Sequence, residues 1–197
     1  MKPLIRKATI TEADLVSDIL REAAGWLAGR GEPLWKAGEL AAENLSGDVG
    51  NGMFYIAWVG ADAAGVFKFQ VEDTVFWPDV PDAESCFIHR FAVRRNYAGK
   101  GISTAMLDYA KAATEAMGRR FLRLDTDAAR PKLRAVYEQQ GFMLHSIRQV
   151  GPYIVARYEC NIGTANLRRD AKSSGEGSVS GDAATETQTL GRDNRRA

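Results

Sequence analysis

The residue types that could do chemistry are gathered in one short basic turn, residues 94 to 101, which reads Arg-Arg-Asn-Tyr-Ala-Gly-Lys-Gly. Gly99 and Gly101 allow the backbone to approach a ligand closely. If a helix begins after Gly101, its first N–H groups are free to bind an anion, and Lys100 with the two arginines adds positive charge there. The turn therefore predicts a phosphate or pyrophosphate site, although a plain turn before a helix would have the same pattern.

Two common nucleotide-binding loops do not match this turn. The ATP-type loop needs Ser or Thr after its lysine, whereas Lys100 is followed by Gly101. The dinucleotide fingerprint needs a third glycine three residues after Gly101, where Thr104 stands. The anion must therefore be identified from the rest of the chain.

A strand and a helix are expected to position the turn. Residues 86 to 93 read as a buried strand, and Pro131 and Gly141 delimit a further helix downstream. The helix after the turn is indicated by apolar residues at helical spacing: Ile102, Ala105, Met106, Tyr109, Ala110, Ala113 and Met117. A further helix is expected to begin near Thr11, which can cap it with Asp14 as the capping-box acid, and to end at Gly29; another is expected over residues 36–45. The other predicted strands are 4–8, 53–59, 66–71, 121–126, 142–150 and 153–160.

Composition bounds the class of protein. The 197 residues are 45% hydrophobic and 26% charged with a net charge of +1, which suits one soluble domain and gives no overall attraction to nucleic acid. Cys86 and Cys160 lie far apart in expected strands, so buried reduced thiols are predicted, and no metal spacing is present. No signal peptide or membrane-length apolar run is seen, and a cytoplasmic protein is the simplest expectation.

The last part of the chain changes in character. Residues 161–197 contain no Phe, Trp or Tyr and are rich in Ser, Thr, Gly, Asp and Arg. Such a segment cannot bury enough apolar surface to order itself. We therefore expect a folded domain over residues 1–160 and a disordered tail over 161–197.

The order of elements, together with two local motifs, resembles the GCN5-related N-acetyltransferases (GNATs). The first motif is the basic glycine turn between strand and helix. The second is Tyr137-Glu138-Gln139-Gln140-Gly141-Phe142, which ends the later helix about 36 residues on from Gly101. The resemblance covers roughly residues 4 to 160. It implies an α/β (α+β) fold with a mixed, mostly antiparallel sheet that splays in the middle, helices on both faces, and acetyl-coenzyme A bound in the splay.

Position by position, the resemblance implies cofactor contacts. The backbone of Phe91 and Val93 would pair with the pantetheine arm, since a strand edge opened by the splay offers unpaired N–H and C=O groups. Asn96 stands where the family usually has Gln or Arg, and Arg130 stands where many members have Asn. Arg130 would either reach the nucleotide phosphates or lie in solvent. The implied cofactor residues are Phe91, Ala92, Val93, Arg94, Arg95, Asn96, Gly99, Lys100, Gly101, Ile102, Ser103, Thr104 and Arg130.

The resemblance also implies catalytic roles. Tyr137 matches the family tyrosine near the sulfur, and a phenol with a pKa of about 10 can protonate a thiolate of similar basicity. By spacing alone, packing of Tyr137 on Leu133 would be favoured. The N–H of Val93 would polarise the thioester carbonyl.

The base is less well defined by the sequence. His89 falls on the same side of its strand as Phe91 and Val93 by simple alternation, and a histidine takes part in deprotonation at the matching place in the arylalkylamine branch of the family. A satisfied core histidine is an equal alternative. Other candidate bases, some of them acting through water, are Glu84, Glu72, Asp73 and, on the next strand, Asp125.

Charge is distributed unevenly along the chain. Residues 90 to 134 contain eleven basic and four acidic residues, whereas residues 72 to 84 contain five acids and no base. The first region would face an anionic cofactor. The second, with Phe76 and Trp77, would suit a cationic amine, although a solvated loop explains the acids equally well. The residues predicted to contact the acceptor are Trp26, Trp35, Glu72 and Trp77; the first two are more often core or lid residues.

The sequence thus predicts transfer of an acetyl group from acetyl-CoA to a primary amine of a small, cationic acceptor. The alternatives are a protein or peptide N-acetyltransferase, a non-catalytic acyl-CoA sensor and a nucleotide-binding module. A peptide acceptor needs an open groove, which the long acidic loop would obstruct. No nucleic-acid, membrane or metal partner is expected, and the chain would act as a monomer or homodimer.

Overall fold

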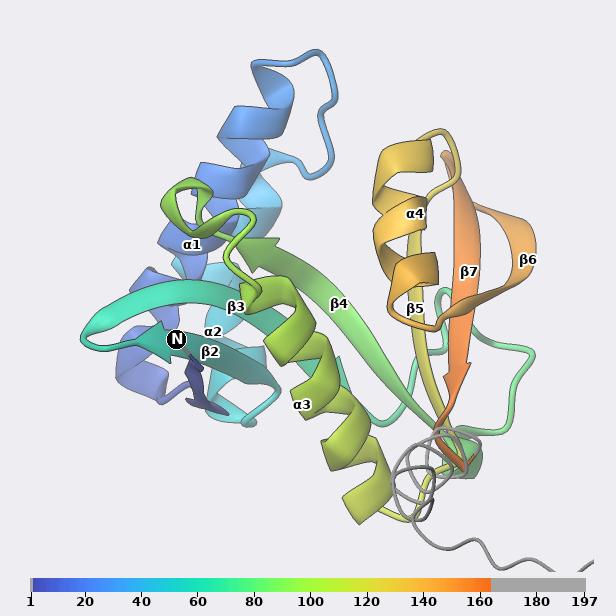
Figure 1. Ribbon diagram of the computed structural model, residues 1–197. Coiled ribbons are helices and arrows are strands. Elements are labelled where there is room, and N and C mark those ends of the chain that lie inside the picture. The colour runs from blue at the N-terminus through green and yellow to red at the C-terminus, as the bar shows by residue number, and fades with distance from the viewer. Residues whose placement is uncertain (1, 164–197) are drawn as a thin grey trace, which may run out of the picture.

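A computed structural model describes residues 2–163 and shows a single mixed sheet flanked by helices (Figure 1). The strands are β1 (Leu4–Lys7), β2 (Phe54–Val59), β3 (Asp62–Gln70), β4 (Ser85–Val93), β5 (Phe121–Asp127), β6 (Met143–Val150) and β7 (Tyr153–Asn161). The helices are α1 (Ala13–Ala28), α2 (Ala42–Gly50), α3 (Ile102–Ala116) and α4 (Pro131–Gln139). Short 3₁₀ turns cover Ile10–Glu12, Ala37–Leu40, Asp82–Glu84 and Arg95–Tyr97.

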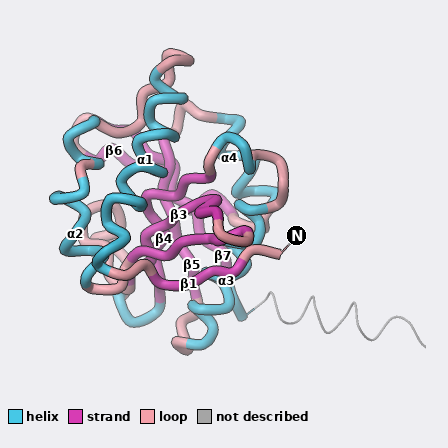
Figure 2. Tube along the Cα trace, turned by 90° about the vertical axis from the view of Figure 1, so that its left-hand side faces the viewer, coloured by secondary structure: helices cyan, strands magenta, loops and turns pink. Residues whose placement is uncertain are grey.

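The sheet confirms the predicted fold class. Its strand order is β1-β2-β3-β4-β5-β7-β6, and only β4 and β5 run parallel. In Figure 2, α1 and α2 lie on one side of the sheet, and α3 and α4 lie on the other. Each side has its own core: Val16, Leu20 and Val49 pack behind the sheet, and Met106, Leu107 and Tyr137 pack in front.

The two central strands separate part of the way along their length. Their pairing begins at Ser85 with Phe121 and ends at Ile88 with Leu124. Beyond that point β4 continues to Val93 against β3, and β5 continues to Asp127 against β7. Figure 1 shows the two strands diverging towards the end where the basic turn lies. We call the paired part the closed end and the diverging part the open end.

A β-bulge changes the alternation of β4 inside the open end. Arg90 has a positive φ of 49°, and the register with β3 shifts between Val66 and Lys68. Ile88 and Phe91 therefore share the front core although they are three residues apart. His89 has the opposite orientation, so the prediction that it shares a side with Phe91 and Val93 is wrong. A single extra residue reverses the phase of every later side chain.

Several boundaries differ from the sequence prediction because local hydrogen bonds decide them. The capping box before α1 is formed by Thr9 and Glu12, whose carboxylate accepts the Thr9 N–H at 2.8 Å, and not by Thr11 and Asp14. The helix expected over residues 36–45 is a 3₁₀ turn followed by α2. At the C-terminus β7 reaches Asn161 and Ile162 is buried, so the fold extends slightly past residue 160. The remaining predicted tail, from residue 164 on, lies outside the described residues.

Two further expectations can be compared with the structure. Cys86 and Cys160 are both buried and free, as predicted. Among residues 2–163, no helix has the length and hydrophobicity needed to cross a bilayer.

Candidate active site

Three ionisable side chains meet behind the sheet where β4 and β5 separate. His89 and Asp125 are the first residues after the last paired positions of the two strands. Nδ1 of His89 lies 3.4 Å from Oδ1 of Asp125, and Nε2 lies 3.0 Å from Oδ2 of Asp73, which follows β3. The ring of Phe76 covers the imidazole at a centroid distance of 5.8 Å. The open end thus carries an Asp–His–Asp cluster (Asp73, His89 and Asp125).

Asp73 is fixed by its own loop. Its Oδ1 accepts the backbone N–H groups of Val75 at 3.1 Å and Phe76 at 2.9 Å, an arrangement typical of an aspartate-initiated turn. Burial opposes its charge, but the contact with His89 and these two N–H groups outweigh burial, so the pKa of Asp73 lies below its ordinary value. Asp73 is therefore an ionised, immobile partner for the imidazole.

Asp125 has the opposite character. Burial raises the pKa of Asp125 to about 6, His89 opposes that rise, and the like charge of Asp73 adds to it. Only 12% of its side chain is exposed. This carboxyl group consequently changes charge near neutral pH, which is the property of a group that takes up and releases protons.

The cluster could also be considered as a metal site, because its three residues each offer a ligand atom and these atoms lie within 4.8 Å of one another. A histidine binds a metal through the lone pair of one ring nitrogen. Here the two carboxylates lie against different ring nitrogens. That arrangement favours an imidazole held at both edges, since a protonated ring can donate from both nitrogens.

Tyr137 reaches the open end from the front of the sheet. It lies on α4, is only 6% exposed, and packs edge-on against Phe142 at a centroid distance of 6.1 Å. Burial, with a further contribution from Asp125, raises the pKa of Tyr137 far above its ordinary value. The phenol therefore stays protonated at neutral pH, and it holds the proton that it could offer to a leaving thiolate more tightly than a free tyrosine does. Tyr137 lies in the front core, whereas Asp125 belongs to the cluster behind the sheet.

The basic turn leads into α3 as the sequence predicts. Gly99 and Gly101 have φ values of 73° and 77°, in the left-handed region that favours glycine. No side chain caps the N-terminus of α3, and a Cβ at either glycine would meet no atom within 4 Å, so the backbone faces open space. Asn96 and Lys100 are exposed beside it. An uncapped helix N-terminus of this kind suits an anionic group.

The two arginines of the turn are already engaged. Arg94 forms an ion pair with Glu22 of α1 and donates to the carbonyl of Ala63 at 3.0 Å. Arg95 stacks its guanidinium 3.8 Å from the ring centroid of Trp26, and its backbone N–H donates to Glu22. The expectation that both line the phosphate approach needs correction: Arg94 ties β4 to α1, and only Arg95 remains exposed.

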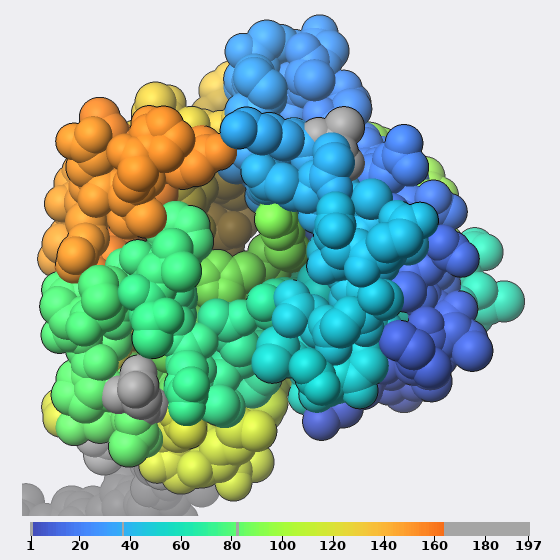
Figure 3. Space-filling model, turned by 180° about the vertical axis from the view of Figure 1, so that it is seen from behind, coloured from blue at the N-terminus to red at the C-terminus, as the bar shows by residue number. Residues whose placement is uncertain are grey.

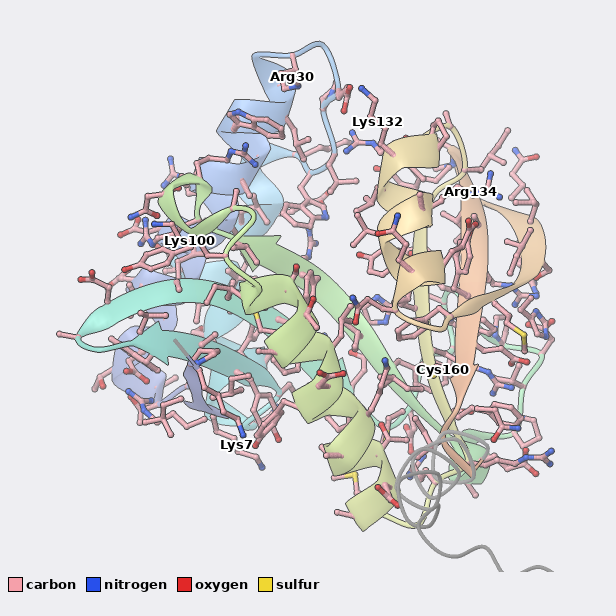
Figure 4. All side chains as sticks on the ribbon, in the orientation of Figure 1. Lys7, Arg30, Lys100, Lys132, Arg134 and Cys160 are labelled. Carbon is pink, nitrogen blue, oxygen red and sulfur yellow. The ribbon has the colours of Figure 1, made fainter. Side chains whose placement is uncertain are left out.

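Arg130 has a different role from either of those predicted. Its guanidinium donates to the backbone carbonyls of Glu32 and Pro33, the latter at 3.3 Å, and Nε lies 3.5 Å from Asp127. It thus joins the start of α4 to the segment between α1 and α2 instead of pointing into solvent. Figure 4 shows Arg30 beyond the end of α1 and Lys132 in the first turn of α4, both towards the upper end of the molecule in that view.

The acidic loop (residues 72–84) packs back onto the sheet. Trp77 is 1% exposed and lies between the guanidinium groups of Arg123, 5.3 Å away, and Arg157, 4.7 Å away. Arg157 in turn forms an ion pair with Asp79 of the loop. The expectation that Trp77 contacts an acceptor is therefore corrected, because its ring has no free surface. Glu72 is exposed, and its neighbour Asp73 is the residue that reaches the cluster.

Glu84 lies at the wrong end of β4 for catalysis. It is exposed and precedes Ser85, and its carbonyl accepts the N–H of Arg120 at 3.0 Å, at the closed end of the sheet. His89 lies five positions further along the chain, which is roughly 16 Å at the usual rise per residue of a strand. The prediction of a catalytic Glu84 is wrong.

The remaining tryptophans divide between two places. Trp26 is 38% exposed at the end of α1, between Arg30 and Arg95, and so lies near the basic turn instead of the cluster. Trp35 is half-buried with its ring 5.4 Å from the guanidinium of Arg90, next to His89 in the chain. Its role as an acceptor contact stays a prediction. Figure 3 shows a hollow behind the molecule, rimmed by β6–β7 (orange), the acidic loop (green) and residues 29–41 (light blue).

Comparison with known proteins identifies the family. A model described as the acetyltransferase (GNAT) family matches residues 20–142, which is more than half of the chain. The chain belongs to this family. An uncharacterized N-acetyltransferase of Bacillus subtilis (strain 168), YesJ, is 26% identical over 142 residues, covering 68% of this chain and 78% of the relative.

Solved structures of acetyltransferases share the fold. A GNAT-family acetyltransferase from Listeria monocytogenes matches with a TM-score of 0.66 and 22% identity, over 80% of this chain and 94% of that chain. The structure of yncA from Salmonella typhimurium with its cofactor acetyl-CoA matches with a TM-score of 0.62 and 11% identity, over 93% of this chain and 100% of that chain. The fold is therefore one that has been crystallised with acetyl-CoA in another protein.

Proposed function

We propose that this protein transfers the acetyl group of acetyl-CoA to a primary amine of a small, cationic acceptor. One observation carries the proposal: a proton donor and a proton-accepting cluster meet from opposite faces at the point where β4 and β5 separate. Tyr137 lies in the front core with α3 and α4, and His89 and Asp125 lie behind. Two reactants that enter from opposite faces would meet there without competing for space.

The front face suits acetyl-CoA. The N-terminus of α3 from Gly101 to Thr104, with Lys100 beside it, would hold the pyrophosphate. The part of β4 beyond Ile88 has lost its β5 partner, so Phe91 and Val93 would offer backbone groups to the pantetheine amides, and the Val93 N–H would polarise the carbonyl. Bound there, acetyl-CoA supplies an activated acyl group whose leaving sulfur Tyr137 would protonate.

The rear face suits a cationic amine. Asp73, Asp125 and a single histidine line the opening, and Arg157 behind them is paired with Asp79. Because two carboxylates face one imidazole, the cluster carries a net negative charge when both are ionised, which attracts an ammonium group. Phe76 provides apolar surface next to it, and Trp35 packs on Arg90, the chain neighbour of His89. The acidic loop is anchored across the strand ends, which leaves a hollow suited to a small acceptor.

Thiol release from acetyl-CoA in the presence of an amine panel tests this proposal. Polyamines, arylalkylamines and aminoglycosides should be used by the wild type, and Tyr137→Phe should lower kcat about 100- to 1,000-fold because the thiolate loses its proton donor. Acetyl-CoA affinity should stay unchanged, since the phenol acts on the leaving group.

Glu84→Gln is the matched control and should keep wild-type kcat, because Glu84 lies at the closed end. A wild type that binds acetyl-CoA but acetylates no amine would indicate a sensor instead of an enzyme. A clear preference for acidic or neutral acceptors would contradict the cationic class.

A further inference from the structure

We propose that Asp125 is the catalytic base that takes the proton from the attacking amine, and that Asp73 and His89 are positioning residues that hold and tune it. This inference rests on the proposed acetyl transfer and names the group that the sequence left undecided. It reverses the order of candidates that the sequence favours, in which His89 comes first.

The surroundings of His89 argue against the imidazole as the free base. A base must present a nitrogen lone pair to the amine, yet Nε2 is 3.0 Å from Asp73 and Nδ1 faces Asp125. Asp73 cannot turn away, because its second oxygen is held by two backbone N–H groups. Both ring nitrogens face a carboxylate, so an amine could reach His89 only by entering between the imidazole and one of the two aspartates.

Asp125 lies at the point where the two central strands separate. It is the first residue of β5 beyond the last β4 pair, and its charge contributes to the raised pKa of Tyr137. Among the described residues, none donates a full hydrogen bond to its buried Oδ1, and the 3.4 Å approach of His89 is longer than one. Oδ2 of Asp73 also lacks a full hydrogen bond, but two backbone N–H groups hold the other oxygen of Asp73, so Asp125 keeps more acceptor capacity.

The proton balance closes with these residues alone. An acceptor that binds as an ammonium first loses one proton to solvent, so that a neutral amine attacks. As the C–N bond forms and the C–S bond breaks, the nitrogen passes a proton to the Asp125 carboxylate, and the sulfur takes the phenolic proton of Tyr137. Because the phenol has a much higher pKa than Asp125, the proton on Asp125 then returns to Tyr137 through water, which restores the carboxylate and the phenol, and no further co-reactant is needed.

The charges that face Asp125 come from four elements. They are His89 of β4, Asp73 after β3, Arg157 of β7 and Tyr137 of α4. Arg157 is paired with Asp79, so the decisive neighbours are His89 and Asp73. Because Asp73 helps to raise the pKa of Asp125 to about 6, activity should rise through that pH as Asp125 ionises.

The pH dependence of kcat in three variants tests the assignment. Asp125→Asn should lower kcat about 100- to 1,000-fold. Its residual rate should lack the acidic limb of the pH profile, which is the fall of kcat below about pH 6. Asp73→Asn should lower kcat less and move the limb to lower pH, because the like charge is gone. His89→Gln should keep the acidic limb but at higher pH, because the imidazole that lowers the pKa of Asp125 is lost.

Loss of the limb in His89→Gln together with its retention in Asp125→Asn would overturn the proposal and make His89 the base. Asp125→Glu, which keeps a carboxyl group, should retain part of the rate and the acidic limb. It is the variant to measure if Asp125→Asn does not fold. A wild type without acetyl transfer to any amine would instead reject the proposed function, and acetyl-CoA affinity would show whether the site itself is intact.

Discussion

The closed and open ends of the β4–β5 pair are built on the same two strands, but they differ in how well their buried charged groups are paired. At the closed end Arg123 contacts Ser85 and Glu159, and Trp77 packs against its guanidinium group. At the open end two buried carboxylates share a single imidazole.

The difference shows where the fold is stabilised and where it retains chemical reactivity. The buried guanidinium of Arg123 has both of these partners, so its desolvation is offset. Asp125 lacks such partners, and its raised pKa records the free energy required to hold its charge in this site. Stability resides where the strands pair, and proton transfer is expected where they part.

The largest expected effect is on the closed end. Trp77→Ala should lower the free energy of unfolding by about 3 to 5 kcal/mol, because it empties a fully buried site and leaves two guanidinium groups without their packing surface. Trp26 is the control: it also lies between two arginines but is 38% exposed, so Trp26→Ala should cost about 1 kcal/mol or less. Chemical denaturation measures both, and equal losses would contradict the distinction.

A smaller effect of opposite sign is expected at the open end. The pKa of Asp125 is about 6 in the folded protein and about 3.9 when unfolded, so the native state binds more protons between these values and loses stability as pH rises through 6. Asp125→Asn should therefore raise the free energy of unfolding by about 1 to 3 kcal/mol at pH 7 to 8.

This gain should disappear below about pH 4, where the wild-type carboxyl group is neutral in both states. Thermal or urea unfolding across that pH range measures it. A gain of equal size at every pH would mean that packing, and not the buried charge, causes the effect.

The order of elements could be predicted because each one carries a local signal. Period-two alternation marked the β2–β3 hairpin, the apolar stripe of α3 marked a helix, and Pro131 marked the start of α4. The bulge could not be predicted, since Arg90 is a residue type that rarely adopts positive φ and nothing in its neighbourhood indicates one. That one residue changed the face on which His89 lies.

The site could be predicted only in part, because some of its features have a local signal and others depend on residues distant in sequence. Glycine positions and the Tyr137 motif are local and were found in the sequence. The partners of Arg94 and Arg130 are Glu22, Glu32 and Pro33, which are distant in sequence and belong to other elements. Asp73 and Asp125 become a cluster only when the end of β3 and the end of β5 are brought to His89, so the sequence could only include them among the alternatives.

Hydrogen exchange with and without acetyl-CoA tests the central claim, that the open end of the β4–β5 pair is the acyl-transfer site. We expect acetyl-CoA to slow exchange at residues 91–93 and 99–104, where β4 lacks its β5 partner and α3 lacks a cap. Residues 85–88, already paired with β5, should be unchanged. Protection confined to the closed end, or absent from both stretches while acetyl-CoA is bound, would contradict it.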